Sequence, residues 1–204
     1  MKTENKELMR QAKEALSGNW GLAIGTFVVY FLIITSIQVI PVAGAIALLI
    51  ITGPFALGLT IFSLSLSRKQ DAELSQIFEG FKKFGVSLGA YLLMVIFIFL
   101  WMLLLIIPGI IAAIAYSQTY YIIAEDDSIG AMDAIKKSKQ MMDGYKWKYF
   151  CLGLRFIGWG LLCILTLGIG FLWLIPYIQI SFAKFYDDVK ILVNIEDTNY
   201  NPSN

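Results

Sequence analysis

The side chains that carry most enzyme chemistry are scarce in this sequence. The chain contains no histidine, and its two cysteines, Cys151 and Cys163, are not in a CxxC arrangement. Without histidine, a Ser-His-Asp triad, a histidine metal site and a histidine proton relay are excluded. The chain also contains no G-x4-GK[S/T] loop for binding phosphate. We therefore expect a protein that is not an enzyme and that holds no metal ion and no cofactor.

Arg155 is the charged residue that lies furthest inside an apolar stretch. If a helix begins near Tyr149, the arginine lies roughly 9 Å inside it by helical rise. A charge inside a membrane is a functional candidate, and its partner here would be an anion or a lipid headgroup. Two structural alternatives remain open: the side chain extends back to the interface, or it pairs with Glu125, Asp126 or Asp187.

Uncharged polar side chains gather at one end of three other apolar stretches. They are Thr60, Ser63 and Ser65; the run Tyr116, Ser117, Gln118, Thr119, Tyr120 and Tyr121; and Tyr177, Gln179 and Ser181. In one interpretation they line a polar cavity that opens to the cytoplasm, with Arg155 at its mouth. In the other they form hydrogen bonds between packed helices, each worth up to about 1–2 kcal/mol. The candidate residues for binding a ligand or lipid are Arg155, Tyr116, Gln118, Tyr120, Tyr121 and Gln179.

The positions of the charges indicate which elements hold these residues. The chain is 58% hydrophobic and 15% charged, whereas a soluble chain is about 25% charged. No charged residue lies between Glu14 and Arg68, between Lys83 and Glu125, or between Arg155 and Lys184. A membrane span needs about 20 mostly apolar residues. The first two gaps are therefore each long enough for two spans. The third gap also holds two spans when it is extended back to residue 149.

Six transmembrane helices in three hairpins are therefore expected. The predicted spans are residues 20–40, 43–66, 85–107, 108–124, 149–167 and 171–186. Proline and glycine break helices through a missing N–H or excess backbone freedom. The predicted turns lie at Pro41, at Pro108 and Gly109, and at Gly168 and Gly170, and the predicted kinks lie at Pro54 and Pro176.

The charges also predict an orientation. Apart from Arg155, every lysine and arginine lies on one side of the predicted hairpins, near the termini or in the two longer loops. The positive-inside rule places that side, with both termini, in the cytoplasm of a plasma-membrane protein. A net charge of +1 gives no field that would attract nucleic acid. The expected partners are the lipid bilayer and, laterally, other membrane proteins or a second copy.

A short amphipathic segment precedes each hairpin. The apolar positions are Leu8, Ala12, Ala15 and Leu16; Leu74, Ile77, Phe78, Phe81 and Phe84; and Ala131, Ala134, Ile135, Ser138, Met141, Met142 and Tyr145. Such spacing gives one apolar face of a helix. We expect three interfacial helices on the cytoplasmic side.

The three units look like internal repeats. Trp20, Phe84 and Trp147 open the hairpins at intervals of about 64 residues. The predicted fold class is an all-α membrane helix bundle with a threefold repeat: residues 4–68, 71–125 and 128–188. The units belong to one transmembrane domain, residues 1–190, and residues 191–204 are expected to form a flexible polar tail.

Two pairs of glycines have the spacing of helix-packing motifs. Gly21 and Gly25, and likewise Gly85 and Gly89, are small residues four positions apart, which permits close approach of another helix. Packing inside the bundle is the first interpretation, and contact with a second copy is the alternative.

Five long stretches carry a resemblance to a known family. They are GPFALGLTIFSLSLSR (53–68), IFEGFKKFG (77–85), FLWMLLLIIPGIIAAIAYS (99–117), KSKQMMDGYKWKYF (137–150) and FIGWGLLCILTLGIGFLWLIPY (156–177). On these stretches the chain resembles the bacterial integral membrane proteins grouped as domain-of-unknown-function family 975. The resemblance implies a polytopic bacterial membrane protein. It implies no activity and no catalytic residues.

Two functions fit these expectations. The first is a non-enzymatic accessory or scaffold protein, acting through its cytoplasmic face and lateral helix contacts in envelope homeostasis or tolerance to membrane-active agents. The alternative is a protein that binds or transports a lipid or small amphiphile in a polar cavity facing the cytoplasm.

Overall fold

The structure is a computed structural model in which every described element is a helix. It describes residues 3–40 and 42–200, with side chains as far as Val193. The predicted turn residue Pro41 and the last four residues of the predicted tail lie outside the described residues. The elements are α1 (Asn5–Leu16), α2 (Trp20–Gln38), α3 (Ala43–Ser67), the 3₁₀ helix η1 (Leu74–Lys83), α4 (Phe84–Leu104), α5 (Ile106–Tyr116), α6 (Thr119–Glu125), α7 (Ala131–Met141), α8 (Lys146–Leu165) and α9 (Phe171–Tyr200).

Five described segments are long and apolar enough to cross a membrane. They are Trp20–Gln38, Ala43–Ser67, Leu74–Leu104, Ile106–Glu125 and Lys146–Leu165. Such a set of apolar helices is the pattern of a multi-pass membrane protein. The sixth predicted span is not confirmed, because α9 combines a short apolar part with charged residues such as Lys184 and Asp187. α9 also continues to Tyr200, past the predicted start of the tail.

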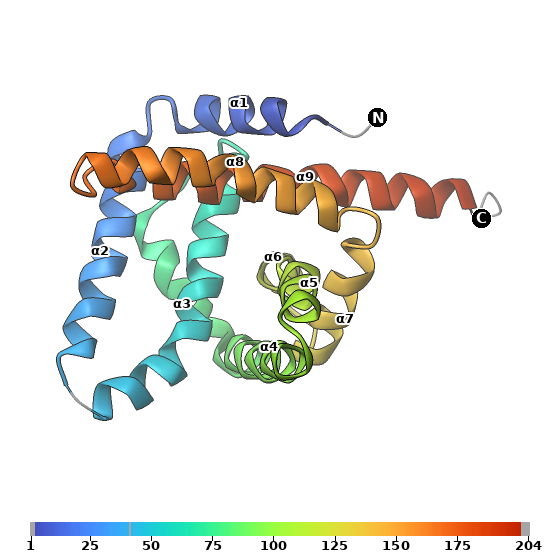
Figure 1. Cartoon of the computed structure of the whole chain (residues 1–204), viewed down its shortest axis with the longest axis horizontal. Helices are drawn as coiled ribbons and strands as arrows, with labels where there is room; N and C mark the ends of the chain where they lie inside the picture. Colours follow the sequence, from blue (N-terminus) through green and yellow to red (C-terminus); the bar gives the residue numbers. More distant parts are fainter. Residues whose placement is uncertain (1–2, 41, 201–204) are drawn as a thin grey trace.

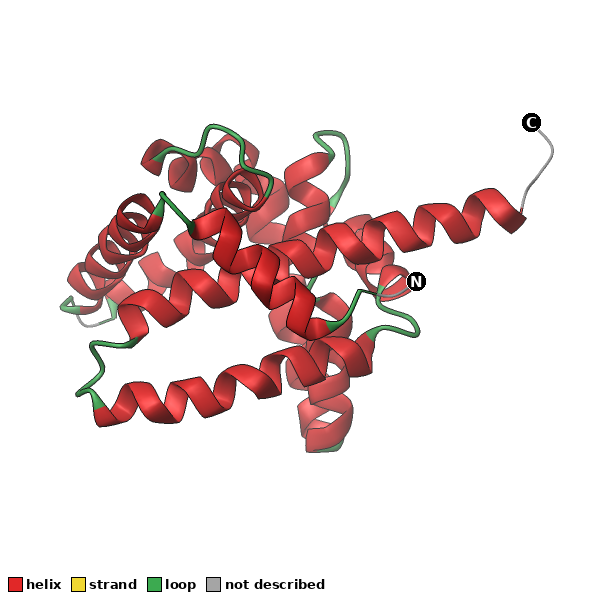
Figure 2. Cartoon of the chain, turned by 90° about the horizontal axis from the view of Figure 1, so that it is seen from above, coloured by secondary structure: helices red, strands yellow, loops and turns green. Residues whose placement is uncertain are grey.

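The three predicted helix pairs form, but they point in different directions. In Figure 1, α2 and α3 stand upright, α8 and α9 lie horizontally across their upper ends, and α4 and α5 are seen along their axes. Figure 2 gives the view from above, where the long C-terminal helix runs across the molecule and beyond the other helices. The hairpins therefore do not form one bundle of parallel spans.

Two amphipathic helices bury the faces that the sequence predicts. The buried residues are Leu8, Ala12, Ala15 and Leu16 on α1, and Ala134, Ile135, Ser138 and Met141 on α7. The middle segment differs because a 3₁₀ helix repeats every three residues. Ile77 and Gly80 are therefore buried in η1, whereas Phe78 is exposed.

η1 and α7 each pack against the hairpin that precedes them in the chain, and α1 packs against the last hairpin. η1 contacts α3, α7 contacts α4, α5 and α6, and α1 closes the cycle by packing on α9. Tyr177 of α9 donates a hydrogen bond of 3.2 Å to the backbone oxygen of Met9 in α1. A cyclic arrangement of this kind is what three equivalent units would form, although the repeat itself stays a prediction.

The apolar surface is concentrated where the hairpins turn. Leu167 is 94% exposed, Val39 78% and Ile106 72%. The buried clusters involve the opposite ends of the hairpins, where the amphipathic helices pack. Exposed apolar ends of this extent are suited to lipid and not to water.

Two helix breaks differ from the prediction. Between α4 and α5 the extended residue is Leu105 (φ −160°, ψ 144°), so Pro108 and Gly109 lie in the first turn of α5. Proline is tolerated there because the first N–H groups of a helix have no intrahelical partner. The predicted span 108–124 is also divided, because α5 and α6 are separated at Ser117 and Gln118.

The remaining proline and glycine positions lie in the predicted elements. Pro54 lies inside α3, which bends along its length in Figure 1, and Pro176 lies inside α9. Gly168 and Gly170 lie in the turn between α8 and α9. Gly168 has a φ of +86°, a conformation that glycine adopts at little cost.

Candidate functional site

A cavity of about 490 Å³ lies where α2, α3, α6, α8 and α9 face one another. Its polar lining comes from segments that are far apart in the sequence: Tyr30, Thr60, Ser117, Tyr120, Tyr121, Tyr149 and Gln179. Its apolar lining includes Phe27, Phe31, Ile175, Ile178 and Phe182. The second, fourth and sixth predicted spans therefore each contribute polar side chains to one space.

Several of these polar groups have no hydrogen-bond partner. Thr60 donates to the backbone oxygen of Ala56 at 2.8 Å, and Ser117 donates to that of Ile114 at 2.8 Å. In contrast, the side chains of Tyr30, Tyr120, Tyr121 and Gln179 form no hydrogen bond with the described part of the chain, and the Tyr120 hydroxyl is buried. Buried polar groups are nearly always hydrogen-bonded, so the Tyr120 hydroxyl calls for water or a ligand in the cavity, and the other three side chains can bind the same molecule.

An apolar groove adjoins the cavity. It has a volume of about 240 Å³ and is lined by Ile24, Phe27, Val28, Phe31, Gly168, Phe171, Leu172 and Ile175. Phe27, Phe31 and Ile175 line both spaces. The polar cavity therefore lies next to a groove with an entirely apolar lining, between α2 and the first part of α9.

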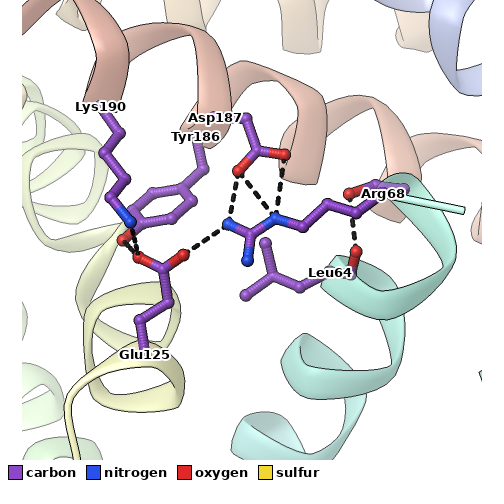
Figure 3. Close-up of polar contacts among 7 residues, drawn as sticks. Leu64, Arg68, Glu125, Tyr186, Asp187 and Lys190 are labelled. Carbon is purple, nitrogen blue, oxygen red and sulfur yellow. Dashed lines mark hydrogen bonds and ion pairs between the residues drawn. The ribbon is translucent and has the colours of Figure 1, made fainter. Parts of the chain in front are cut away.

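A network of charges joins the ends of α3, α6 and α9 (Figure 3). Arg68 contacts Asp187 at 2.6 Å and Glu125 at 2.5 Å through the same Nη2 atom. Lys190 contacts Glu125 at 2.6 Å, and the Tyr186 hydroxyl donates to the same carboxylate at 2.5 Å. The hydrogen bonds to Asp187 raise the pKa of the Arg68 guanidinium above its ordinary value.

The network is connected to the cavity through stacked rings. Tyr121, which lines the cavity, stacks on Tyr186 with their ring centroids 5.0 Å apart. Tyr186 in turn binds Glu125, which binds Arg68. The charges therefore hold together the helices that form the cavity without lining it themselves.

The structure brings only some of the predicted binding residues together. Tyr120, Tyr121 and Gln179 line the cavity. Gln118 is buried next to α7, where its backbone N–H donates to Ser138 Oγ at 3.1 Å, and its side-chain oxygen has no partner among the described residues. Tyr116 packs near Phe97 and does not line the cavity.

Arg155 is not among the residues that line this cavity. Its side chain is exposed on α8, and it forms no hydrogen bond or ion pair with the described residues. The three carboxylates considered as its partners have other contacts, since Glu125 and Asp187 bind Arg68 and Asp126 accepts hydrogen bonds from Ser128. Of the alternatives given above, extension of the Arg155 side chain toward the membrane interface agrees with this exposed position.

The sequence analysis missed Tyr30, Tyr149 and Arg68. The two tyrosines are isolated in apolar or aromatic surroundings, where tyrosine usually indicates an interface anchor. The contacts of Arg68 could have been predicted from the sequence. Arg68 follows the second predicted span, Glu125 comes directly after the fourth and Asp187 follows the sixth. Charges of opposite sign at equivalent ends of the units indicate that those ends meet.

The close helix approaches occur at other glycines than those predicted. Among the described residues, a Cβ atom on Gly21, Gly25 or Gly85 would meet nothing within 4 Å, and one on Gly89 would meet only Ala131 Cβ at 3.4 Å. Packing inside the chain therefore does not explain the first three positions, and contact with a second copy stays a prediction. The two tightest contacts lie instead between α3 and η1, at Gly58 and Gly80, and α3 also approaches α4 closely at Gly53.

Three further side chains could act as nucleophiles by their type. Ser87 lies between Gly85 and Gly89 in a G-x-S-x-G sequence, but it is part of helix α4 and donates to the backbone oxygen of Phe84 at 3.0 Å. A nucleophile elbow needs a strand-to-helix turn and a histidine, and the chain has no histidine. Cys151 and Cys163 are free thiols, and no group of three metal-ligating side chains occurs among the described residues.

Comparison with known proteins identifies a family. The chain matches the family described as "Protein of unknown function (DUF975)" over residues 1–108 and over residues 102–192. No curated protein and no solved structure matches the chain. The family resemblance of the five long stretches is therefore confirmed, and because the matches extend over most of its length, the chain belongs to the DUF975 family.

Proposed function

We propose that this protein is a non-enzymatic, multi-pass protein of the bacterial plasma membrane that binds an amphiphilic molecule, with both of its termini in the cytoplasm. The observation that carries the proposal is the polar cavity adjoining an apolar groove, with Phe27, Phe31 and Ile175 shared between them. An amphiphile has the same two parts, a polar end and an apolar chain.

The dimensions of the two spaces support this function. The cavity of about 490 Å³ is within the range of small-molecule sites, about 300–1,000 Å³. A chain that enters the groove leaves other lipid chains, so it gains close packing but no hydrophobic free energy from water. The polar end must therefore supply the selectivity, through groups such as Tyr120 and Gln179.

Lipid retention by a cavity-filling variant tests the proposal. Ala56 lines the cavity, so Ala56→Phe should fill part of it. Ala45→Phe is the matched control, because Ala45 lies on the same helix and is exposed. Both variants and the wild type are extracted with a membrane-active polymer, and the co-purified lipids are measured by native mass spectrometry. We expect a specific lipid adduct in the wild type and the control and its loss in Ala56→Phe.

The same experiment can contradict the proposal. If the wild type carries no lipid beyond the bulk composition of its membrane, the cavity holds only water and the binding function is wrong. If the lipid adduct persists in Ala56→Phe at the wild-type level, the lipid binds elsewhere on the surface. The proposed binding in this cavity is then wrong as well.

The accessory or scaffold function is the second candidate, and open space beside Gly21 and Gly25 favours it. These glycines lie four residues apart on α2, and no atom of the described residues fills the space beside them. A helix of a partner or of a second copy fits such a surface. Gly21→Leu should then remove a cross-linked partner or dimer that the wild type shows, and deletion of the protein should change sensitivity to membrane-active agents. If the wild type shows no cross-link, this candidate fails.

A further inference from the structure

We infer that the ligand of the cavity carries an uncharged headgroup with several hydroxyl groups, a sugar or a polyol, linked to an acyl chain. This inference rests on the proposed binding function and names the chemical class of its ligand. It follows from three properties of the cavity: the absence of charge in its described lining, the type of its unpaired groups and its aromatic walls.

No charged side chain is among the residues that line the cavity in the described part of the chain. The nearest network of charges is satisfied internally, with Arg68 bound to Glu125 and Asp187. A phosphate or carboxylate loses hydration when it enters such a site and needs a cation in return. Arg155, the remaining candidate cation, does not line the cavity. Anionic and zwitterionic headgroups are therefore poorly matched to the site.

The unpaired groups match hydroxyl groups in number and type. Tyr30, Tyr120 and Tyr121 each offer a hydroxyl that donates and accepts, and Gln179 offers an amide with both functions. A headgroup with several hydroxyl groups also donates and accepts at each position. A headgroup with one hydroxyl would leave most of these side chains without a ligand partner, which is costly where the group is buried, as the Tyr120 hydroxyl is.

The walls of the cavity are aromatic. Phe182 and Tyr149 lie with their ring centroids 4.6 Å apart, and both line the space. Phe27 and Phe31 form the wall that continues into the groove. Flat rings cover the C–H faces of a sugar ring while hydroxyl groups at its edge reach the tyrosines, and the acyl chain continues along Phe27 and Phe31.

Competition among lipids with identical acyl chains tests this assignment. The probes are monoglucosyl diacylglycerol, diacylglycerol, phosphatidylglycerol and phosphatidylethanolamine, each added to the protein in an amphipol without glycoside detergents and measured by native mass spectrometry. We expect monoglucosyl diacylglycerol to bind at least 10-fold more tightly than each of the others. Free glucose should not displace it, because glucose has no chain for the groove.

Variants connect this binding to the cavity. Tyr120→Phe and Gln179→Leu should each weaken the binding of the glucosyl lipid roughly 3- to 10-fold, the effect of one lost hydrogen bond. Tyr116→Phe is the control, because Tyr116 lies on the neighbouring helix outside the cavity, and it should bind like the wild type. Folding of each variant is checked by size-exclusion chromatography.

The failures of the two proposals are distinguishable. Equal or tighter binding of phosphatidylglycerol or phosphatidylethanolamine that Ala56→Phe removes would overturn the headgroup class and leave amphiphile binding intact. Equal binding of diacylglycerol would overturn the requirement for several hydroxyl groups. Binding of no probe, or binding that Ala56→Phe does not affect, would overturn both proposals.

Discussion

Arg68 connects three helices through a single side chain. It lies directly after α3 and bonds to Glu125 at the end of α6 and to Asp187 in α9. The side chains of all three are largely shielded from solvent, with 29%, 19% and 23% of their area exposed. Hydrogen bonds to charged groups of this kind contribute about 1.5–3 kcal/mol, more than an exposed surface pair does.

Removal of this arginine should therefore destabilise the protein. In Arg68→Ala, Asp187 loses its ion pair and Glu125 keeps only Lys190 and Tyr186. We expect a loss of about 1.5–3 kcal/mol in the free energy of unfolding, seen as a lower midpoint of thermal unfolding in detergent. Arg10→Ala is the control, because Arg10 pairs with Glu7 on the exposed face of α1, and its midpoint should hardly change. Equal midpoints for the two variants would show that the network does not hold the helices.

At the scale of elements, η1 approaches α3 more closely than side chains allow. A Cβ atom on Gly58 would lie 2.0 Å from the Ile77 oxygen, and one on Gly80 would lie 1.9 Å from the Pro54 oxygen. Gly58→Ala should therefore force the two helices apart and cost about 3 kcal/mol. Gly21→Ala should be neutral or stabilising, since its Cβ atom meets open space and alanine favours helices. Thermal unfolding compares the two, and equal stabilities would contradict the close packing.

Ser138 of α7 forms hydrogen bonds with the backbone at the break between α5 and α6. Its hydroxyl donates to the Ala115 oxygen at 2.8 Å and accepts from the Gln118 N–H at 3.1 Å. Ser138→Ala should cost about 1–3 kcal/mol, because it leaves two buried backbone groups without partners. Ser75→Ala, at an exposed position of η1, serves as the control. Hydrogen exchange should increase first around Gln118, and unchanged exchange there would show that α5 and α6 do not need this contact.

The sequence predicts those elements whose signals are local. Runs without charge define the helix pairs, and the spacing of Leu8, Ala12 and Ala15 defines the buried face of α1, because burial there follows the helical period. The 3₁₀ form of η1 and the break at Ser117 were not predictable in this way. They depend on Gly58 and Ser138, residues of other elements that make the unusual backbone favourable.

The candidate site likewise contains residues that the sequence predicts and residues that it does not. Tyr120, Tyr121 and Gln179 are recognisable because polar side chains are unusual in apolar stretches. Tyr30 and Tyr149 join them only through the packing of α2 and α8, which no local pattern specifies. The absence of Arg155 from the cavity lining was not predictable for the same reason, since the face of α8 that meets the cavity depends on how the hairpins cross.

For the whole molecule, the directions of the hairpins determine which of them can cross a membrane together. α8 and α9 run across α2 and α3 in Figure 1, alongside the amphipathic helix α1. α1 keeps a charged outer face with Glu7 and Arg10, which belongs in water. If α2 and α3 cross the bilayer, the α8–α9 hairpin lies along one side of it, which the proposed orientation makes the cytoplasmic side, with apolar residues such as Leu167 in lipid.

Cysteine labelling from outside the cell tests this arrangement. In a Cys151→Ser, Cys163→Ser background, single cysteines replace Ile40 at the first turn, Ile169 at the third turn and Ser75 in η1. We expect a membrane-impermeant maleimide to label Ile40→Cys on intact cells, because the first hairpin then reaches the outer surface. Ser75→Cys should react only after the cells are opened, and Ile169→Cys should stay unlabelled from outside because its hairpin follows α1 along the inner leaflet. Outside labelling of Ile169→Cys would show that the third hairpin crosses the membrane, as the six-span prediction requires, whereas labelling of Ser75→Cys on intact cells would reverse the orientation.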